Sequence, residues 1–158
     1  MFPVMALWPT DEPAGVLISN GLSTMGFALP AAIGAALLEP SKPVVAFTGD
    51  GGLLMCLGDL RTAARESLAV RIIVFDDGDL SLIKIKQLQR GYQPIGVSIG
   101  DVNWHSLGAA LGVLAFVARS EEALKACLAE TVTHPGPVLI AAKISSDRYQ
   151  ATIRALRG

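Results

Sequence analysis

Two short segments combine acidic residues with glycine, and each directly follows an apolar run. The first reads Thr-Gly-Asp-Gly-Gly at 48–52, and the second reads Asp-Asp-Gly-Asp at 76–79. Glycines after a strand let backbone amides approach a phosphate, because no β-carbon stands in the way. Asp50 would repel a lone phosphate, whereas a divalent cation such as Mg²⁺ can bridge a carboxylate and a diphosphate. Together the two segments predict a cation and diphosphate site.

Either segment, taken singly, is more typical of a plain turn. Their occurrence at two predicted strand ends is what indicates a site. Other motifs that hold phosphate or a nucleophile are absent from the sequence, which has no GxxxxGK[ST], no GxGxxG after a strand and no GxSxG.

Buried strands must carry these segments. Near-continuous apolar runs predict strands at 43–47, 71–75, 113–117 and 137–142. Longer amphipathic or apolar segments predict helices at 25–38, 54–67, 80–90, 104–111, 121–131 and 147–156. Asn103 and Ser120 are suited to begin two of these helices, and Gly112 to end one. The alternation predicts an α/β fold, a doubly wound, mostly parallel sheet with helices on both faces, which binds ligands beyond the carboxyl ends of its strands.

Composition narrows the class of protein. The 158 residues, at 51% apolar and 17% charged, suit a single domain over 1–158 with a large core or an oligomer interface. The net charge of −1 argues against nucleic-acid binding. The most apolar stretch, 26–38, is too short to span a membrane, and the first ten residues lack the basic start of a signal peptide, so a cytoplasmic protein is expected. Cys56 and Cys127 indicate neither a disulfide scaffold nor a zinc site.

A longer motif accompanies the Gly-Asp-Gly at 49–51. Residues 21–35, GLSTMGFALPAAIGA, resemble the GLGTMGFGLPAAIGA stretch of the acetolactate synthase and pyruvate oxidase group of thiamine diphosphate (ThDP) enzymes. The Gly-Asp-Gly with Asp77 downstream is similar to the diphosphate and Mg²⁺ motif of the same enzymes. The resemblance covers nearly the whole chain and implies a ThDP-binding pyrophosphate domain.

The resemblance also implies roles for individual residues. The side chains of Asp50 and Asp77 and the carbonyl of Asp79 would ligate Mg²⁺. Met25 would wedge between the two rings of the cofactor and hold it bent. Backbone near Ser23 would meet the aminopyrimidine. The residues expected to bind the cofactor are Ser23, Thr24, Met25, Gly49, Asp50, Gly51, Gly52, Asp77, Asp79, Leu80 and Ser81, of which Gly51, Gly52, Leu80 and Ser81 would hold the diphosphate through backbone amides.

Three departures from the family pattern matter. The usual Asn-Asn is Asp76-Asp77 here, which adds negative charge and predicts a stronger dependence on the divalent ion. Lys86 stands where biosynthetic acetolactate synthases carry Trp, and it is a candidate substrate contact. The pyrimidine-binding domain, whose Glu activates the cofactor in this family, is absent from the sequence. The chain is therefore expected to be a C-terminal fragment or a split subunit with no catalytic residue of its own and no turnover alone.

The function implied is decarboxylation of a 2-oxo acid such as pyruvate and transfer of the resulting acyl carbanion to a carbonyl acceptor. The expected partners are a pyrimidine-binding domain or subunit and further copies of the chain. Other ThDP activities stay open, namely pyruvate oxidase, 2-oxo-acid decarboxylase and C–C lyase. Two readings from other classes are a non-catalytic domain that binds a diphosphate ligand or a partner, and a response-regulator-like nucleotide-binding domain, which leaves residues 21–35 unexplained.

Overall fold

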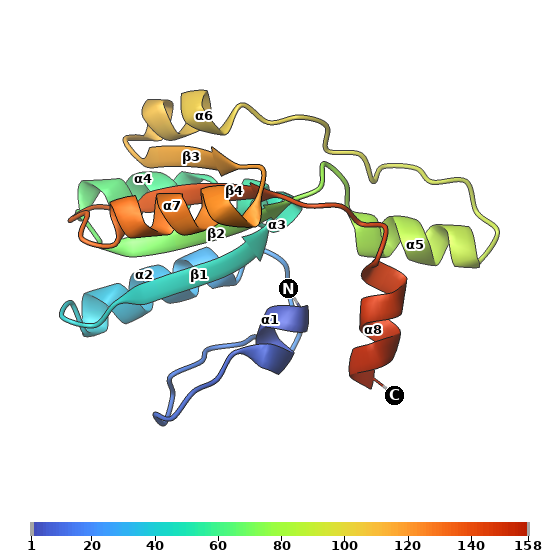
Figure 1. The fold of residues 1–158 in the computed structure, drawn as a ribbon, viewed down its shortest axis with the longest axis horizontal. Helices are drawn as coiled ribbons and strands as arrows, with labels where there is room; N and C mark the ends of the chain where they lie inside the picture. The colour runs from blue at the N-terminus through green and yellow to red at the C-terminus, as the bar shows by residue number, and fades with distance from the viewer. Residues whose placement is uncertain (1, 158) are drawn as a thin grey trace.

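The centre of the molecule is a four-stranded, all-parallel sheet in the order β1-β2-β4-β3 (Figure 1). A computed structural model describes residues 2–157, apart from the side chains of residues 2, 3, 5 and 157. Both faces of a parallel sheet are buried, which explains the uninterrupted apolar runs. The predicted α/β class and parallel sheet are confirmed. The strands are β1 (Val44–Gly49), β2 (Val70–Asp76), β3 (Leu114–Ala118) and β4 (Val138–Lys143).

Helices cover both faces of the sheet, as predicted. Helix α2 packs on β1, β2 and α4, and α6 packs on β3 and α4, so these three helices share one face. Helix α7 packs on β3 and β4 from the other face (Figure 1). The helices are α1 (Phe2–Leu7), α2 (Ala28–Leu38), α3 (Asp50–Met55), α4 (Gly58–Arg65), α5 (Ser81–Gln89), α6 (Trp104–Leu111), α7 (Glu121–Thr131) and α8 (Tyr149–Arg157).

The larger core fills the face beneath α2, α4 and α6. Leu53, Leu60, Ile72 and Leu139 are fully buried there, and each buried side chain of this size contributes about 1.5–3 kcal/mol to folding. The smaller core under α7 is built on alternate residues of the same strands, because successive side chains of a strand point to opposite faces.

Helices α6 and α7 have the predicted bounds because their caps are local. The Asn103 Oδ1 accepts a hydrogen bond of 3.0 Å from the Ser106 amide, and the Ser120 Oγ accepts one of 3.2 Å from the Ala123 amide. Gly112 follows α6 with φ at 75°, a left-handed conformation that favours glycine.

Two other predicted helices differ from the structure. The helix expected from residue 25 begins at Ala28, because Gly26 has φ at 81° and turns the chain, so Met25 lies before the helix. The helix expected over 54–67 is two helices, and α3 starts at Asp50 directly after β1, with a break at Cys56 and Leu57. A low-propensity glycine begins α4 after this break. Helix α1 was not predicted at all.

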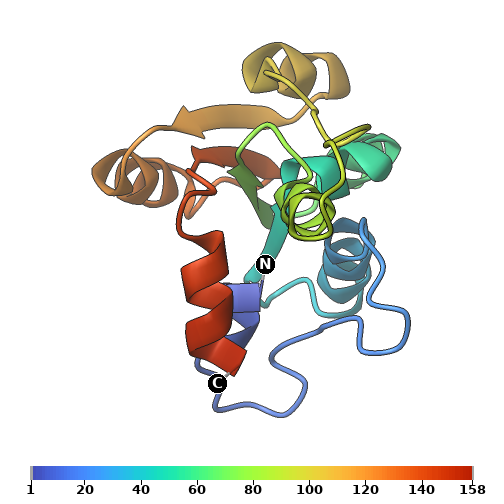
Figure 2. The same cartoon turned by 90° about the vertical axis from the view of Figure 1, so that its right-hand side faces the viewer.

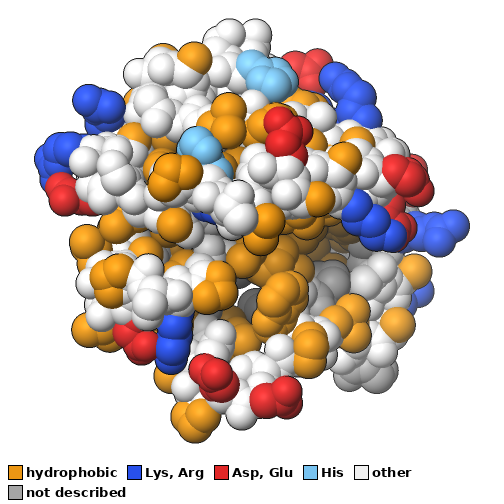
Figure 3. Space-filling model, turned by 60° about the vertical axis from the view of Figure 1, so that its left-hand side comes forward, with side chains coloured by type: hydrophobic (Ala, Val, Ile, Leu, Met, Phe, Trp, Pro, Cys, Tyr) orange, Lys and Arg blue, Asp and Glu red, His pale blue; other side chains and the backbone are white. Residues whose placement is uncertain are grey.

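The amino-terminal part lies against the sheet and the last helix. The ring of Trp8 is 5.2 Å from that of Phe47 on β1, and α1 lies beside α8 (Figure 2). In a view that brings the left-hand side of Figure 1 forward, apolar side chains surround a hollow in the surface (Figure 3). Within residues 2–157, no helix has the length and apolar character needed to cross a membrane.

Candidate functional site

Asp50 joins the ends of two strands. It is the first residue of α3, follows the last residue of β1 and is only 4% exposed. Its Oδ1 accepts a 2.7 Å hydrogen bond from the Gly51 amide, and its Oδ2 accepts one of 2.9 Å from the Gly78 amide, just beyond β2. The two acidic segments therefore meet at the carboxyl edge of the sheet.

Asp77 lies at the same edge and organises the loop that leads to α5. Its Oδ1 accepts from the Asp79 amide at 3.2 Å, and its Oδ2 accepts from the Ser81 hydroxyl at 2.7 Å. Tyr149, on α8, lies near this carboxylate. Burial, followed by the negative charge of Asp77, raises the pKa of Tyr149 above its usual value.

The carboxylates are close enough to affect one another. Burial raises the pKa of Asp50, and the negative charges of Asp77 and Asp76 add to this effect, while the amides of Gly51 and Gly78 oppose it. Across residues 2–157, neither Asp50 nor Asp77 forms an ion pair with a basic side chain, although Asp76 and Asp79 both do. Two clustered carboxylates without a counter-ion fit a hard divalent cation.

The oxygen atoms at the strand ends are of the kind and number that Mg²⁺ commonly uses. No group of three or more His, Cys, Asp or Glu side chains able to hold a metal occurs among the described residues. The predicted site needs only two, Asp50 and Asp77, with the carbonyl of Asp79 as the third protein ligand. Mg²⁺ commonly uses one or two carboxylates and completes its shell with phosphate oxygens and water.

Other side chains pack closely against Gly51, beside these carboxylates. A β-carbon at this position would collide with the Leu80 Cδ2 and would lie 3.1 Å from the Ile99 Cδ1 and 3.4 Å from the Met25 Cε. Met25 thus reaches the strand ends from the turn before α2, although it is 42% exposed. Ile99 belongs to the α5–α6 connection, and the sequence analysis did not single it out.

The backbone amides predicted to hold a diphosphate differ in their present partners. The Gly51 amide donates to Asp50, and the Leu80 amide donates to the Val97 carbonyl at 2.7 Å. Gly52 and Ser81 lie in the first turns of α3 and α5, where amides have no acceptor within the helix. The Gly78 carbonyl accepts from the amides of residues 99 and 100, so this connection lies along the acidic loop.

The segment before α2 is exposed at two further predicted residues. The Ser23 Oγ donates to the Ser19 carbonyl at 3.1 Å, and the residue has φ at 50°, a strained conformation for a non-glycine residue. The Thr24 Oγ1 donates to the Met25 carbonyl at 3.0 Å. The contact of this segment with the aminopyrimidine stays a prediction.

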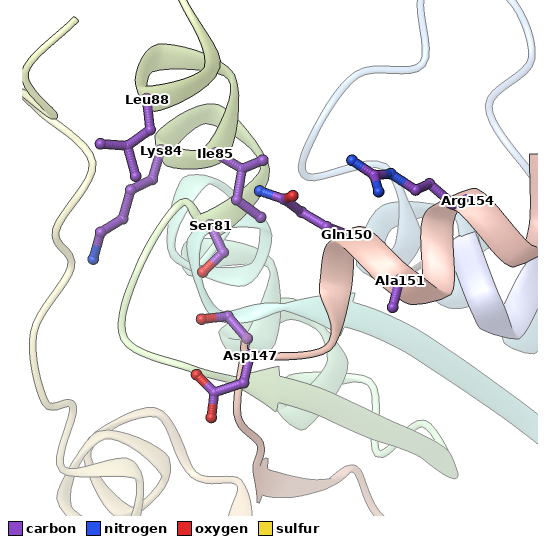
Figure 4. A pocket seen from close by; sticks show the side chains of 9 residues that line it. Ser81, Lys84, Ile85, Leu88, Asp147, Gln150, Ala151 and Arg154 are labelled. Atoms are coloured by element: carbon purple, nitrogen blue, oxygen red, sulfur yellow. The ribbon is translucent and has the colours of Figure 1, made fainter. Parts of the chain in front are cut away.

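Helix α5 presents Lys84 rather than Lys86 to the strand ends. The Lys84 Nζ lies 2.6 Å from the Asp79 Oδ2, whereas Lys86 is exposed. Lys84 also lines a cavity of about 430 Å³ between α5 and α8, into which Ile85 and Gln150 point from opposite sides (Figure 4). The remaining lining residues are Ser81, Leu88, Ser146, Asp147, Ala151 and Arg154.

The fold places the chain in a known structural class. A solved structure of the thiamine diphosphate-dependent 4-hydroxybenzoylformate decarboxylase of Rhodococcus jostii RHA1 is similar to it with a TM-score of 0.73. The two sequences are 24% identical, and the similarity covers 78% of this chain and 24% of that one. The class is the ThDP-binding α/β fold.

The family follows from the sequence comparison. The family model described as the thiamine pyrophosphate enzyme, C-terminal TPP binding domain, matches residues 2–142. The chain belongs to this family, and its cofactor is thiamine diphosphate.

The curated relatives are acetolactate synthases. The isozyme 1 large subunit of Escherichia coli K12 is 36% identical over 89% of this chain and 25% of its own length. The catabolic acetolactate synthase of Raoultella terrigena is 39% identical over 80% of this chain and 22% of its own length. The chain thus spans about a quarter of the length of the relatives it matches.

Proposed function

We propose that this chain holds Mg²⁺ and ThDP as the cofactor-binding part of an acetolactate synthase-like enzyme. The enzyme would decarboxylate a 2-oxo acid such as pyruvate and transfer the acyl group to a second carbonyl compound. The names of the relatives support this reaction class, and their identities of 36% and 39% lie within the ThDP-binding domain.

One observation carries the cation part of the proposal. The Asp50 carboxylate is buried at the end of β1, close to Asp77, and within the described chain no basic side chain neutralises either group. A divalent cation would supply the missing positive charge and would connect both carboxylates to a diphosphate. The carbonyl of Asp79 would provide the third protein ligand.

The residues of this chain position the cation and the cofactor and limit the access of water to them. ThDP, when bound, supplies the carbanion chemistry and the electron sink for decarboxylation. Asp50 and Asp77 hold the cation, and the absence of a side chain at Gly51 lets Leu80 pack closely beside them. Met25, Leu80 and Ile99 form apolar walls around Gly51 that limit the access of water.

Turnover is proposed to need a pyrimidine-binding domain or subunit, which would supply the activating Glu. The relatives are about four times as long as the stretch matched here. The exposed apolar side chains of Leu7, Trp8 and Leu22 are compatible with such a partner, and self-association across a dimer is proposed on the same ground.

Calorimetric titration of ThDP into the chain, with Mg²⁺ and then with EDTA, tests the proposal. We expect binding that requires Mg²⁺ and is lost in Asp50→Ala, because the remaining carboxylate cannot hold the cation alone. Asp11→Ala, an exposed acid far along the chain from the site, is the matched control and should bind as the wild type does.

Adding a separately produced pyrimidine-binding domain of a relative extends the test to catalysis. Pyruvate-dependent release of CO₂ from the mixture would support the 2-oxo acid reaction. No ThDP binding by the wild-type chain, even with that domain and Mg²⁺ present, would overturn the proposed cofactor site and favour a non-catalytic domain.

A further inference from the structure

Asp76 is a buried carboxylate at the end of β2, next to the proposed cation ligand Asp77. It has no exposed surface. Its Oδ2 accepts a hydrogen bond from the Trp104 Nε1 at 2.6 Å and forms an ion pair with the Lys143 Nζ at 2.9 Å. Its Oδ1 is buried and has no hydrogen-bond partner in the described part of the chain. Lys143 is thus the cation that compensates a charge that would be costly to bury alone.

The register of the sheet brings Lys143 to this position. Asp76 and Lys143 are opposite residues of the parallel strands β2 and β4. The Asp76 carbonyl also accepts from the Ile144 amide at 3.0 Å, which extends the connection between the strands by one residue. The end of β2 is therefore held to β4 by backbone and by charge, and to α6 by the Trp104 indole.

The same carboxylate acts on the proposed cation site. The Asp76 side chain adds to the negative charge that Asp50 experiences, alongside that of Asp77. Without an ammonium beside Asp76, three uncompensated carboxylates would lie at one edge of the sheet. Such an edge would still attract a free cation but would repel a diphosphate more strongly.

We propose that Lys143 is a positioning residue of the cofactor site. Its ammonium neutralises Asp76, so that this buried carboxylate does not add to the negative charge that the diphosphate meets beside Asp50 and Asp77. This inference rests on the proposed function. The second bond of Lys143, 3.1 Å to the Asp101 Oδ1, carries little of the effect, because Asp101 is almost fully exposed.

The test compares ThDP affinity at saturating Mg²⁺ in five proteins, the wild type, Lys143→Met, Lys143→Arg, Asp76→Asn and the double variant, at a temperature where all are folded. Lys143→Met should weaken ThDP binding about tenfold, since a charge-assisted bond and one neutralised charge are lost. Lys143→Arg should restore most of the affinity. Lys143→Met should have no effect in an Asp76→Asn background, because the neutral amide that replaces the carboxylate needs no ammonium. This last comparison also serves if the single variant does not fold.

Binding of Mg²⁺ alone separates an electrostatic role from a merely structural one. Lys143→Met should bind free Mg²⁺ at least as well as the wild type while it binds ThDP more weakly, whereas a loosened site would lose both. Asp101→Asn should bind both like the wild type.

Three results would overturn the inference: wild-type ThDP affinity in Lys143→Met, a parallel loss of Mg²⁺ binding, or an equal loss in the Asp76→Asn background. A wild-type chain that binds no ThDP would instead overturn the proposed function, and this inference with it.

Discussion

Strand β2 carries an ionised side chain near each end, and the two are accommodated differently. Near its start, the Arg71 guanidinium is buried and donates to three backbone carbonyls, those of Val132 at 3.1 Å, His134 at 2.6 Å and Gly136 at 3.1 Å, while its Nε is buried without a hydrogen-bond partner in the described part of the chain. At its end, Asp76 is buried against an ammonium and an indole, with one oxygen left without a partner in the described part of the chain.

The difference follows the polarity of the strand–helix units. The carbonyls around Arg71 belong to the end of α7 and the turn after it, where a helix carries partial negative charge. At the other edge, α3, α5 and α6 begin, and the acidic residues lie beside these starts. One edge of the sheet holds a buried cation with backbone carbonyls alone, whereas the other keeps two carboxylates, Asp50 and Asp77, that a bound cation can neutralise.

Replacing Arg71, near the start of β2, should have the largest effect on stability. Arg71→Met leaves three carbonyls without their donor and should lower the free energy of unfolding by about 3 kcal/mol. Because these carbonyls lie at the edge opposite the site, the affinity for Mg²⁺ and ThDP should not change. Urea denaturation and calorimetric titration of the same sample check both halves. A concurrent loss of affinity would show that the two ends of β2 are coupled.

Adding a β-carbon at Gly51, at the carboxyl edge of the sheet, should affect ThDP binding more than stability. The β-carbon of Gly51→Ala would displace the Leu80 side chain towards Ile99, and the affinity for ThDP should fall about tenfold, or about 1.4 kcal/mol. Gly58→Ala is the matched control, since a β-carbon there meets no atom within 4 Å. Equal ThDP dissociation constants for the two variants would contradict the role given to Gly51.

The smallest expected effect concerns charge at the site end. Because burial and the charge of Asp77 raise the pKa of Asp50, cation-dependent ThDP binding should be lost as the pH falls through that raised value. Asp77→Asn removes one negative charge, so the pKa of Asp50 falls and the loss of binding should move to lower pH. The dependence of ThDP binding on Mg²⁺ should also weaken severalfold, because one negative charge fewer then has to be neutralised beside the diphosphate.

Titrations of ThDP from neutral to acidic pH, at several Mg²⁺ concentrations, measure both changes. The stability of the ligand-free chain should depend on pH in the opposite direction to ThDP binding. A raised carboxyl pKa means that the folded state holds the proton longer, so stability from this group declines as the pH rises through that window. An unchanged pH profile and Mg²⁺ requirement in Asp77→Asn would show that the second Asp of the pair adds nothing.

The strand ends could be predicted because their signals are local. The apolar runs placed each strand within two residues, and parallel pairing of β1 with β2 then required Asp50 and the 76–79 segment to share an edge. The caps at Asn103 and Ser120 similarly predicted two helices with correct bounds. Met25 was misplaced in a helix because its neighbour Gly26 adopts a left-handed turn that the apolar pattern does not reveal.

The residues that surround the site could not be predicted, because their positions depend on tertiary structure. Lys143 reaches Asp76 only because β4 lies between β2 and β3, an order that no short motif encodes. Trp104, Ile99 and Tyr149 come from other segments and meet the site only after folding. Apolar or isolated side chains of this kind carry no signal in a single sequence.

The hydrogen bond between Trp104 and Asp76 places a fluorescent side chain at the end of β2. The sequence contains two tryptophans, of which Trp8 is 49% exposed and Trp104 is 1% exposed. A buried indole and a solvated one emit at different wavelengths, so their signals can be separated. The indole of Trp104 donates to the residue immediately before Asp77, so we expect its emission to change, without any label, when a cation binds at the end of β2.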